Sequence, residues 1–498
     1  MSISFPTIPS NLRVPLFWAE MDNSEANTTQ DSGPALLIGL ANTGSSIPTN
    51  QLTIMPSASL AGKIMGRGSQ LARMVAKYRA IDPFGELWVI AVDEPEGEAA
   101  TATVTITGTA QASGTLSLYV SATRVQAAVV TGDAPEAVAS TLAAAINANA
   151  DLPVTATAAA GAVTLTARHK GLTGNDIPLM MNYYGTVGGE TMPDGVSVAI
   201  TAMSGGTGAP DLSDTVAAMG DEPFDFIGTP FSDSASLATL ALEMNDSSGR
   251  WSYARQLYGH VYTAKIGTLS DLVALGDKMN NQHITVAGYE TGVQTSADEL
   301  VALRTARNAV FIRNDPARPT QTGELTGALP APAGSRFTLT EQQSLLMHGI
   351  ATAYAEVGTL RIQRDITTYK QNAYGVADNS YLDSETLHTS AYVIRQLKSI
   401  VTSKYPRHKL ANDGTRFGSG QAIVTPAVLK GEMCASYRTM ERAGIVENFD
   451  LFKKYLVVER NASDPSRVDV LFPPDYVNQL RVFALLNQFR LQYAEESE

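Results

Sequence analysis

The residues between Ser403 and Pro426 form a dense group of side chains that could bind an anion. The stretch SKYPRHKLANDGTRFGSGQAIVTP combines three glycines with five basic or titratable side chains, Lys404, Arg407, His408, Lys409 and Arg416. Such a group could hold a phosphate, a nucleic acid or an acidic face of another protein. No strand pattern leads directly into the glycines and no helix pattern begins on them, as a phosphate-binding loop requires. We therefore interpret the stretch as a basic connector used for packing and for docking on other copies.

A search for a catalytic site finds few candidates. Imidazole chemistry is limited to six residues, His169, His260, His283, His348, His388 and His408. His260 and His283 begin strand patterns, a position typical of hydrogen-bonded structural histidines. Ser232 follows a strand pattern in IGTPFSD, but no base can be identified near it, and no G-x-S-x-G turn occurs. We predict no catalytic residue.

Metal and cofactor motifs are also missing from the sequence. It contains no H-E-x-x-H, no pair of cysteines with metal-binding spacing, no EF-hand loop and no G-x-x-x-x-G-K-[ST]. The single Cys434 excludes a disulfide within one chain and fits a reducing compartment. We predict no cofactor and no metal.

The charge of the chain argues against a general nucleic-acid binder. Its 36 Lys and Arg face 49 Asp and Glu, which gives a net charge of −13. Residues 361–498 hold 18 basic and 16 acidic residues, so residues 1–360 hold the other 18 and 33. The N-terminus lacks a signal-peptide pattern, and no apolar run approaches the length of a membrane span. We expect a soluble chain that is made in a cytoplasm.

The elements that would position any site alternate between strands and helices. Buried strand patterns occur at 35–41, 87–92, 224–229, 259–265 and 283–288, and helix patterns at 60–80, 234–245, 268–280 and 297–310. GRGSQ (66–70) lies inside the first helix pattern. This alternation predicts a doubly wound α/β fold with a mainly parallel sheet covered on both faces. The sequence leaves open whether the 33–92 part packs on the later sheet or stands apart.

Residues 93–205 differ in composition from their surroundings. They hold three basic residues and are rich in Ala, Thr, Gly and Val. Alternating patterns in ATVTITG, GTLSLYV and GAVTLTAR predict strands, and Asp133 is placed to cap a helix with Val138, Leu142 and Ile146 on one stripe. We interpret the segment as a small, β-rich α+β domain inserted at the periphery of the α/β one.

The remaining sequence predicts an α+β C-terminal domain. The proline-rich residues 314–336 are typical of a boundary. Helix patterns follow near 340–355, 381–404 and 427–443, with strand patterns at 455–461, 467–474 and 480–492. The predicted division of the chain is an N-terminal arm (1–34), an α/β segment (35–92), the inserted domain (93–205), the main α/β domain (206–336), the C-terminal domain (337–479) and a C-terminal strand or arm (480–498).

Both ends of the chain are apolar and extended. The C-terminal stretch is apolar on both faces of a strand, and its candidate contact residues are Leu480, Val482, Phe483, Leu485 and Phe489. Such a strand is either buried within its own chain or paired with a partner sheet. The proline-rich N-terminal arm offers Phe5, Ile8 and Val14. With Arg407 and Lys409 of the connector, these residues are the predicted subunit contacts, and they favour strand exchange between copies.

Several stretches together resemble the tail sheath proteins of contractile-tailed bacteriophages, especially the Mu-like group. The resemblance runs through most of the chain, and its carriers are ARHKGLTGNDI (167–177), MGDEPFDFIGTPFSD (219–233), RQLYGHVYTA (255–264), DPARPTQT (315–322), TTYKQNAYGVADNSYLDSETL (367–387), YPRHKLANDGTRFGSGQAIVTP (405–426) and VVERNASDPSRVDVLFPPDYVNQLRVFALLNQFRL (457–491). Each stretch alone would be weak, but as a set they are specific.

The resemblance implies a structural protein of the virion, assembled in the host cytoplasm, whose copies stack as six-fold rings around a tail tube. Such a sheath contracts and drives the tube through the host envelope, so its expected partners are itself, the tube, the baseplate and the tail terminator, with no nucleic acid and no membrane insertion. The core would be subtilisin-like in topology without the protease residues. A serine hydrolase on that scaffold is the alternative hypothesis.

Overall fold

The computed structural model describes residues 33–418 and 420–491. Its centre is a nine-stranded sheet in the order β14-β16-β15-β13-β12-β11-β1-β3-β2. The strands are β1 (Ala35–Leu40), β2 (Thr53–Ile54), β3 (Leu87–Val92), β11 (Phe226–Gly228), β12 (His260–Gly267), β13 (Ile284–Glu290), β14 (Glu324–Leu325), β15 (Ile350–Glu356) and β16 (Thr359–Arg364). The six strands from β15 to β3 run parallel, while β2, β16 and β14 add antiparallel edges. The predicted, mainly parallel sheet is confirmed.

Helices cover both faces of this sheet because alternate side chains of the buried strands point to opposite sides. Leu37 and Val89 pack with the helices α1 (Ala58–Ile64), α2 (Gln70–Ile81) and α7 (Ala297–Asn314). Ile38 and Ile90 pack on the other side with α4 (Ser213–Met219), α5 (Ser234–Met244), α6 (Leu269–Asp277) and α8 (Leu339–Met347). The segment 33–92 is therefore part of the central sheet, because β1 lies between β11 and β3.

Three expectations about these elements were wrong. The pattern at 60–80 forms two helices, because Gly66 and Gly68 take left-handed backbone (φ +85° and +76°) and GRGSQ is a turn between them. The pattern at 340–355 ends as a helix at Met347 and continues as β15 after Gly349, which also has positive φ. The central sheet also runs across residue 336, where we expected a boundary, because β15 and β16 come after it.

The inserted unit is a sandwich of two small sheets with one helix. One sheet has the order β10-β4-β8-β7 and the other β6-β5-β9. Its elements are β4 (Ala99–Thr107), β5 (Gly114–Val120), β6 (Thr123–Val129), α3 (Pro135–Ala148), β7 (Val154–Ala159), β8 (Ala162–Lys170), β9 (Leu179–Met181) and β10 (Ser197–Ile200), with short 3-10 turns at Leu172–Asp176 and Thr186–Gly188. The expected stripe of α3 is buried. Asp133 does not cap α3, because its carboxylate accepts the backbone N–H of Val130 in the preceding turn.

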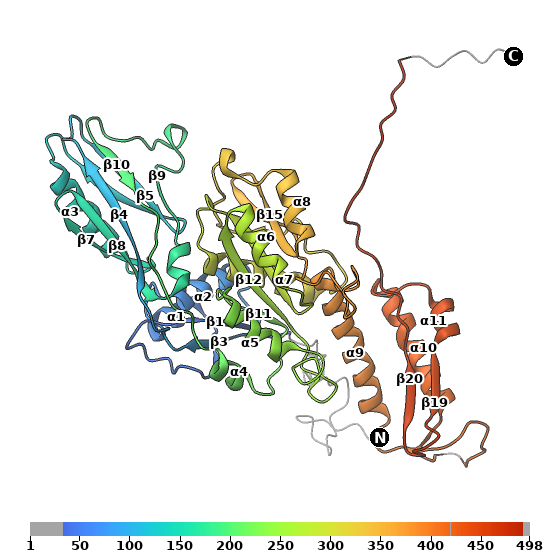
Figure 1. The fold of residues 1–498 in the computed structure, drawn as a ribbon. Helices are drawn as coiled ribbons and strands as arrows, with labels where there is room; N and C mark the ends of the chain where they lie inside the picture. The colour runs from blue at the N-terminus through green and yellow to red at the C-terminus, as the bar shows by residue number, and fades with distance from the viewer. Residues whose placement is uncertain (1–32, 419, 492–498) are drawn as a thin grey trace, which may run out of the picture.

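The inserted unit lies against the side of the sheet that carries α2 and α7 (Figure 1). The Gln70 backbone N–H at the start of α2 donates to His169 Nε2 at 3.1 Å. Ser121 Oγ donates to Ser296 Oγ at 2.7 Å just before α7, and both side chains are buried. Arg67 adds an exposed ion pair with Asp151 at 2.6 Å. The contact is therefore hydrogen-bonded at its centre and charged at its rim.

The chain ends in a separate C-terminal lobe at the side of the molecule away from the inserted unit (Figure 1). The long α9 (Ser384–Lys404) leads into it, and the lobe contains β17 (Lys409–Leu410), β18 (Ile423–Val424), α10 (Pro426–Arg442), α11 (Phe449–Tyr455), β19 (Val457–Arg460) and β20 (Val468–Leu471). Tyr437 and Phe452 stack at its core with ring centroids 3.7 Å apart. None of the helices in the described part of the chain is long and apolar enough to span a membrane.

Gly68 and Gly44 offer a matched test of the contact between the inserted unit and the sheet. Both have nearly the same left-handed φ (+76° and +77°), but a Cβ on Gly68 would lie 2.5 Å from the carbonyl oxygens of Ala150 and Leu152, whereas one on Gly44 would meet nothing within 4 Å. Each Gly→Ala change costs about 1–2 kcal/mol in backbone strain. Gly68→Ala must also displace the inserted unit.

We expect thermal unfolding of Gly68→Ala at least about 5 °C below that of Gly44→Ala, since about 1 kcal/mol shifts the midpoint of a large domain by roughly 2–4 °C. Equal midpoints would show that the inserted unit is not held at this turn.

Candidate functional site

The most unusual surface of the molecule is its C-terminal arm, Leu480–Leu491. The apolar side chains of the arm lie open to solvent, with Phe483 79%, Leu486 90% and Leu491 96% exposed. The arm forms no strand ladder with any other segment that the structure describes, and Figure 1 shows it leading away from the body of the molecule. Of the two predicted fates of this segment, burial within its own chain is therefore excluded for the described residues. Its expected strand is an extended segment that pairs with no strand of the described chain.

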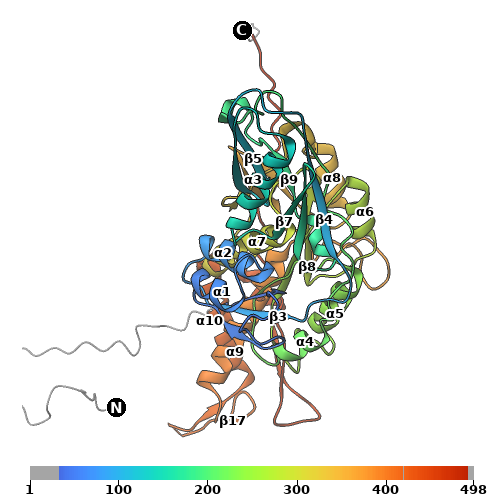
Figure 2. The same cartoon turned by 90° about the vertical axis from the view of Figure 1, so that its left-hand side faces the viewer.

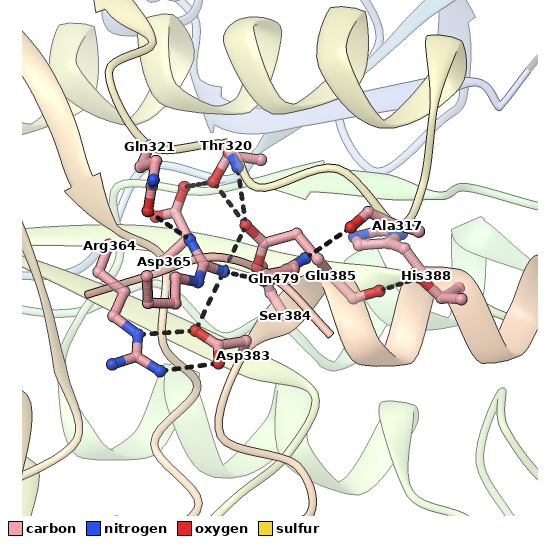
Figure 3. Close-up of polar contacts among 12 residues, drawn as sticks. Ala317, Thr320, Gln321, Arg364, Asp365, Asp383, Ser384, Glu385, His388 and Gln479 are labelled. Atoms are coloured by element: carbon pink, nitrogen blue, oxygen red, sulfur yellow. Dashed lines mark hydrogen bonds and ion pairs between the residues drawn. The ribbon is translucent and has the colours of Figure 1, made fainter. Parts of the chain in front are cut away.

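The first residues of the arm are held firmly, in contrast to the rest. Gln479 Nε2 donates to the Ala317 carbonyl at 3.0 Å (Figure 3), and Gln321 Nε2 donates to the Leu480 carbonyl at 3.2 Å. The Arg481 guanidinium lies 3.0 Å from Glu385 Oε1. The same guanidinium lies 3.2 Å from an oxygen of Asp383 and donates to Gln321 Oε1 at 3.3 Å. We call residues 479–481 and their partners the anchor.

The carboxylates of the anchor are also held in position by residues outside the arm. Glu385 lies in the first turn of α9 and is completely buried. One of its oxygens accepts both the backbone N–H and the hydroxyl of Thr320, each at 2.9 Å. Asp383, the N-cap residue of α9, forms a two-bonded pair with Arg364 at 2.8 and 2.9 Å (Figure 3). Arg481 therefore faces two carboxylates, of Asp383 and Glu385, that other residues already hold in position.

A second ion pair lies deeper in the same cluster. Asp365 is fully buried, pairs with Arg304 of α7 and accepts the Thr320 hydroxyl at 3.2 Å. Burial raises the pKa of Glu385, and the charge of Arg481 acts against that increase. The cluster thus balances the cations Arg304, Arg364 and Arg481 with Asp365, Asp383 and Glu385. Removing Arg481 would leave a buried carboxylate without its cation.

The hairpin of β19 and β20 is a candidate acceptor for such an arm. The two strands pair only with each other, so both outer edges lack a strand partner among the described residues. Val457, Val470 and Leu471 on this hairpin are 44%, 43% and 62% exposed. An isolated two-stranded sheet is marginal in water, and an open apolar edge readily accepts a further strand.

The predicted contact residues fall into three groups. The structure exposes all five of the arm, Leu480, Val482, Phe483, Leu485 and Phe489, and Phe5, Ile8 and Val14 lie outside the described residues. Arg407 and Lys409 are exposed in the connector, where β17 pairs with β18. Figure 2 places β17 at the end of α9 away from the arm, so connector and arm are separate surfaces.

Sequence reasoning missed the anchor itself. Arg481 lies within the apolar run of the arm, and the signal was a cation in a segment whose only charged residues are Arg481 and Arg490. Its acidic partners, Asp383 and Glu385, lie about a hundred positions earlier at a helix start, where carboxylates are common for local reasons. Nothing in the local pattern joins the two regions.

The geometry does not assemble a hydrolytic site around Ser232. It follows β11 and lines a cavity of about 220 Å³ at the carboxyl edge of the sheet, and none of the residues lining this cavity is a histidine. His260 begins β12 and His283 precedes β13, so both lie at the opposite edge. His260 Nε2 is 2.8 Å from the Thr285 hydroxyl and His283 Nε2 is 2.8 Å from Asp246, as expected of structural histidines.

Burial also lowers the pKa of two imidazoles in this region, His260 and His388. The effect is strong for His260 and brings the pKa of His388 to about 3. Both rings are thus neutral near pH 7. Among the described residues, no three His, Cys, Asp or Glu side chains gather closely enough to hold a metal ion.

Comparisons with known proteins agree on one family. Residues 95–207 match the phage tail sheath protein beta-sandwich domain, residues 205–368 the phage tail sheath protein central domain, and residues 376–490 the phage tail sheath C-terminal domain. The Mu-like prophage FluMu tail sheath protein of Haemophilus influenzae is 39% identical, over 99% of this chain and 100% of that protein.

One solved structure shows the same fold at lower identity. The sheath tail protein of Desulfitobacterium hafniense superposes with a TM-score of 0.50 at 14% identity, covering 94% of this chain and 97% of that one. The sheath tail protein Lin1278 of Listeria innocua gives a TM-score of 0.47 at 14% identity, covering 89% and 92%.

The anchor generates a test with a defined pH dependence. We expect Arg481→Met to lower the free energy of unfolding by roughly 3 kcal/mol at pH 7, because it leaves Glu385 buried and unpaired. The loss should be smallest below about pH 4.3, the ordinary Glu pKa, because the carboxyl is then neutral in both states. It should grow as the pH rises through the raised folded-state pKa.

Urea unfolding across this pH range measures the effect, with Arg407→Met as the control because that arginine is exposed. Adding Glu385→Gln to Arg481→Met should restore part of the lost stability. A loss that is independent of pH would contradict the assigned pairing.

Proposed function

Because the chain belongs to the phage tail sheath proteins, we propose that it polymerises as stacked six-fold rings around a tail tube and contracts to drive that tube through the host envelope. It is a structural component of the virion and not an enzyme, because the family and the relative that it matches are structural tail sheath proteins. The observation that carries the proposal is the anchored arm with its exposed apolar side chains.

The arm supports polymerisation through strand exchange. A strand that is apolar on both faces is stable only when both faces are covered, and within the described chain neither is. We propose that the arm of one subunit adds to the β19–β20 hairpin of a neighbour, with the N-terminal arm and its Phe5, Ile8 and Val14 as a further exchanged segment. The arm from Leu480 to Leu491 can span roughly 40 Å when extended, enough to leave one subunit and enter another.

An exchange of this kind can link many subunits one after another. The donor surface is the arm and the acceptor is the hairpin, so the interface is heterologous: each copy gives to one neighbour and receives from another. Such interfaces close into rings or continue as helical filaments. Stacked rings joined by arms combine closure within a ring with continuation along the stack.

Contraction would be a change between two packings of the same chain. Bodies that slide and rotate against one another lose rigid contacts, whereas an extended strand tied at both ends can follow the movement. We propose that the subtilisin-like core and lobe form the repacking bodies, that the peripheral inserted unit decorates the outside, and that the arms stay attached throughout. The work then comes from the difference in packing energy, without a nucleotide.

Charge would assist the repacking. The first 360 residues are strongly acidic and the connector is basic, so Arg407 and Lys409 are placed to dock on acidic faces of neighbouring subunits. The proposed further partners are the tube, the baseplate and the terminator protein, and assembly would take place in the host cytoplasm.

Removal of the arm tests the proposal directly. We expect the purified full chain to form rings or tubes in negative-stain electron microscopy, and a chain that ends at Gln479 to stay monomeric in sedimentation, because the C-terminal strand can no longer be donated to the hairpin of a neighbour. Tubes of normal appearance from the truncated chain would overturn strand exchange.

A single charge in the arm provides a milder test. Phe489→Asp should reduce the fraction of assembled protein at least about tenfold, because a carboxylate would have to be buried between sheets. The matched control is Val187→Asp on the inserted unit, where the side chain is fully exposed. Equal assembly of the two variants would contradict burial of Phe489.

A further inference from the structure

The inserted unit carries a pocket of about 470 Å³ that shares no residue with the anchor, the arm or the β19–β20 hairpin. Its floor is the outer face of β5 and β6, and its wall is the loop 188–194. Side chains alternate along these strands, so Leu116 and Leu118 pack in the core of the sandwich while Thr115 and Ser117 line the pocket. Pockets of roughly 300–1,000 Å³ are typical of sites for small molecules.

Ser117 is a buried residue of this floor whose side chain lacks a partner. It is 3% exposed, and its hydroxyl forms no hydrogen bond with any other residue that the structure describes. A buried hydroxyl without a partner is unfavourable. Because Ser117 lines the pocket, a molecule bound there would supply the missing hydrogen bond.

Three further polar side chains share the pocket with Ser117. Gln126 lies directly opposite it on β6, Arg124 lies two positions earlier on the same face, and Asp194 comes from the loop. Gln126 and Asp194 are exposed, and their side chains form no hydrogen bond within the described chain. The Arg124 side chain is 46% exposed and donates from Nη1 to Glu190 at 3.2 Å. An amide, a carboxylate and the other nitrogens of a guanidinium are thus available to a ligand.

Glu190 shapes the pocket without offering a free oxygen of its own. It is buried, and its Oε1 accepts the Tyr119 hydroxyl at 2.5 Å in addition to Arg124. Its Oε2 accepts the Tyr184 backbone N–H at 3.0 Å. These bonds hold the loop over the sheet and orient the guanidinium of Arg124, so the site is formed before any ligand arrives.

The available groups suit a neutral sugar better than a charged ligand. A sugar hydroxyl both donates and accepts hydrogen bonds, so it matches a mixture of hydroxyl, amide, guanidinium and carboxylate groups. A phosphate would be repelled by Asp194 and Glu190, and an ammonium group by Arg124. We propose that the pocket binds a short neutral saccharide through Ser117, Gln126, Arg124 and Asp194.

The position of the pocket leaves it free for such a ligand. Figure 1 shows the inserted unit at the end of the molecule away from the C-terminal lobe and the arm, so the pocket lies apart from the surfaces proposed for strand exchange. Gly189 lines the pocket, and a Cβ on it would meet nothing within 4 Å, so the loop leaves space at this point. Sugar binding goes beyond polymerisation and does not depend on it.

A glycan array probed with the full-length chain tests the site. Immobilised neutral and acidic oligosaccharides serve as ligands, and free hexoses and inorganic phosphate serve as competitors. The first variant is Gln126→Ala, and its matched control is Gln111→Ala, which changes the same residue type at an exposed position that does not line the pocket. The second variant, Ser117→Ala, removes the buried hydroxyl and adds no charge.

We expect the chain to be retained on neutral glycans. Gln126→Ala and Ser117→Ala should each raise the concentration for half-saturation at least about fivefold, as loss of one hydrogen bond predicts, and Gln111→Ala should change it by less than about twofold. Competition by free hexoses would assign recognition to a single sugar unit, and its absence would assign it to the longer glycan. No retention on neutral glycans, retention on acidic glycans alone, competition by phosphate, or equal binding of Gln126→Ala and Gln111→Ala would overturn the proposal.

Discussion

Glu385 is a carboxylate buried at the start of α9, and the cation beside it comes from Arg481, near the far end of the chain. A buried carboxylate without a cation is costly, so this pairing holds the end of the lobe against the central sheet. The exposed residues of the arm begin next to Arg481. One end of the arm is therefore fixed to the core of its own subunit, while its apolar faces remain uncovered.

The path of the chain shows how force would travel through a subunit. It leaves the core along α9, builds the lobe and returns to the core at Gln479 before the arm begins. Tension on the arm would therefore reach Glu385, Asp383 and, through Thr320 and Asp365, helix α7. The lobe is closed off as a loop between two attachments to the core, so it can offer its hairpin to a neighbour while its own arm is loaded.

Much of the fold could be predicted from the sequence, because buried parallel strands and amphipathic helices leave local patterns. The strand that includes Leu37 and Ile38 is an example, as is the stripe of Val138, Leu142 and Ile146. Two of the errors came where a glycine with positive φ broke a helical pattern, at Gly66 and Gly349.

The candidate site was predictable only in part. The exposed arm follows from an apolar pattern on both faces of one strand, which is local information. The anchor joins Arg481 to Glu385 and Gln321 across 96 and 160 positions, and no periodicity records such a pairing. The basic connector was visible by composition, but no local pattern indicates which surface it contacts.

The central claim is that the arm is fixed at home and completed by a neighbour. A cryo-electron microscopy reconstruction of the assembled polymer tests it most directly. The account predicts that residues 482–491 form a strand beside β19 or β20 of an adjacent subunit, while Arg481 stays on Glu385 of its own. Arms folded back onto their own subunit, with no density joining neighbouring lobes, would contradict it.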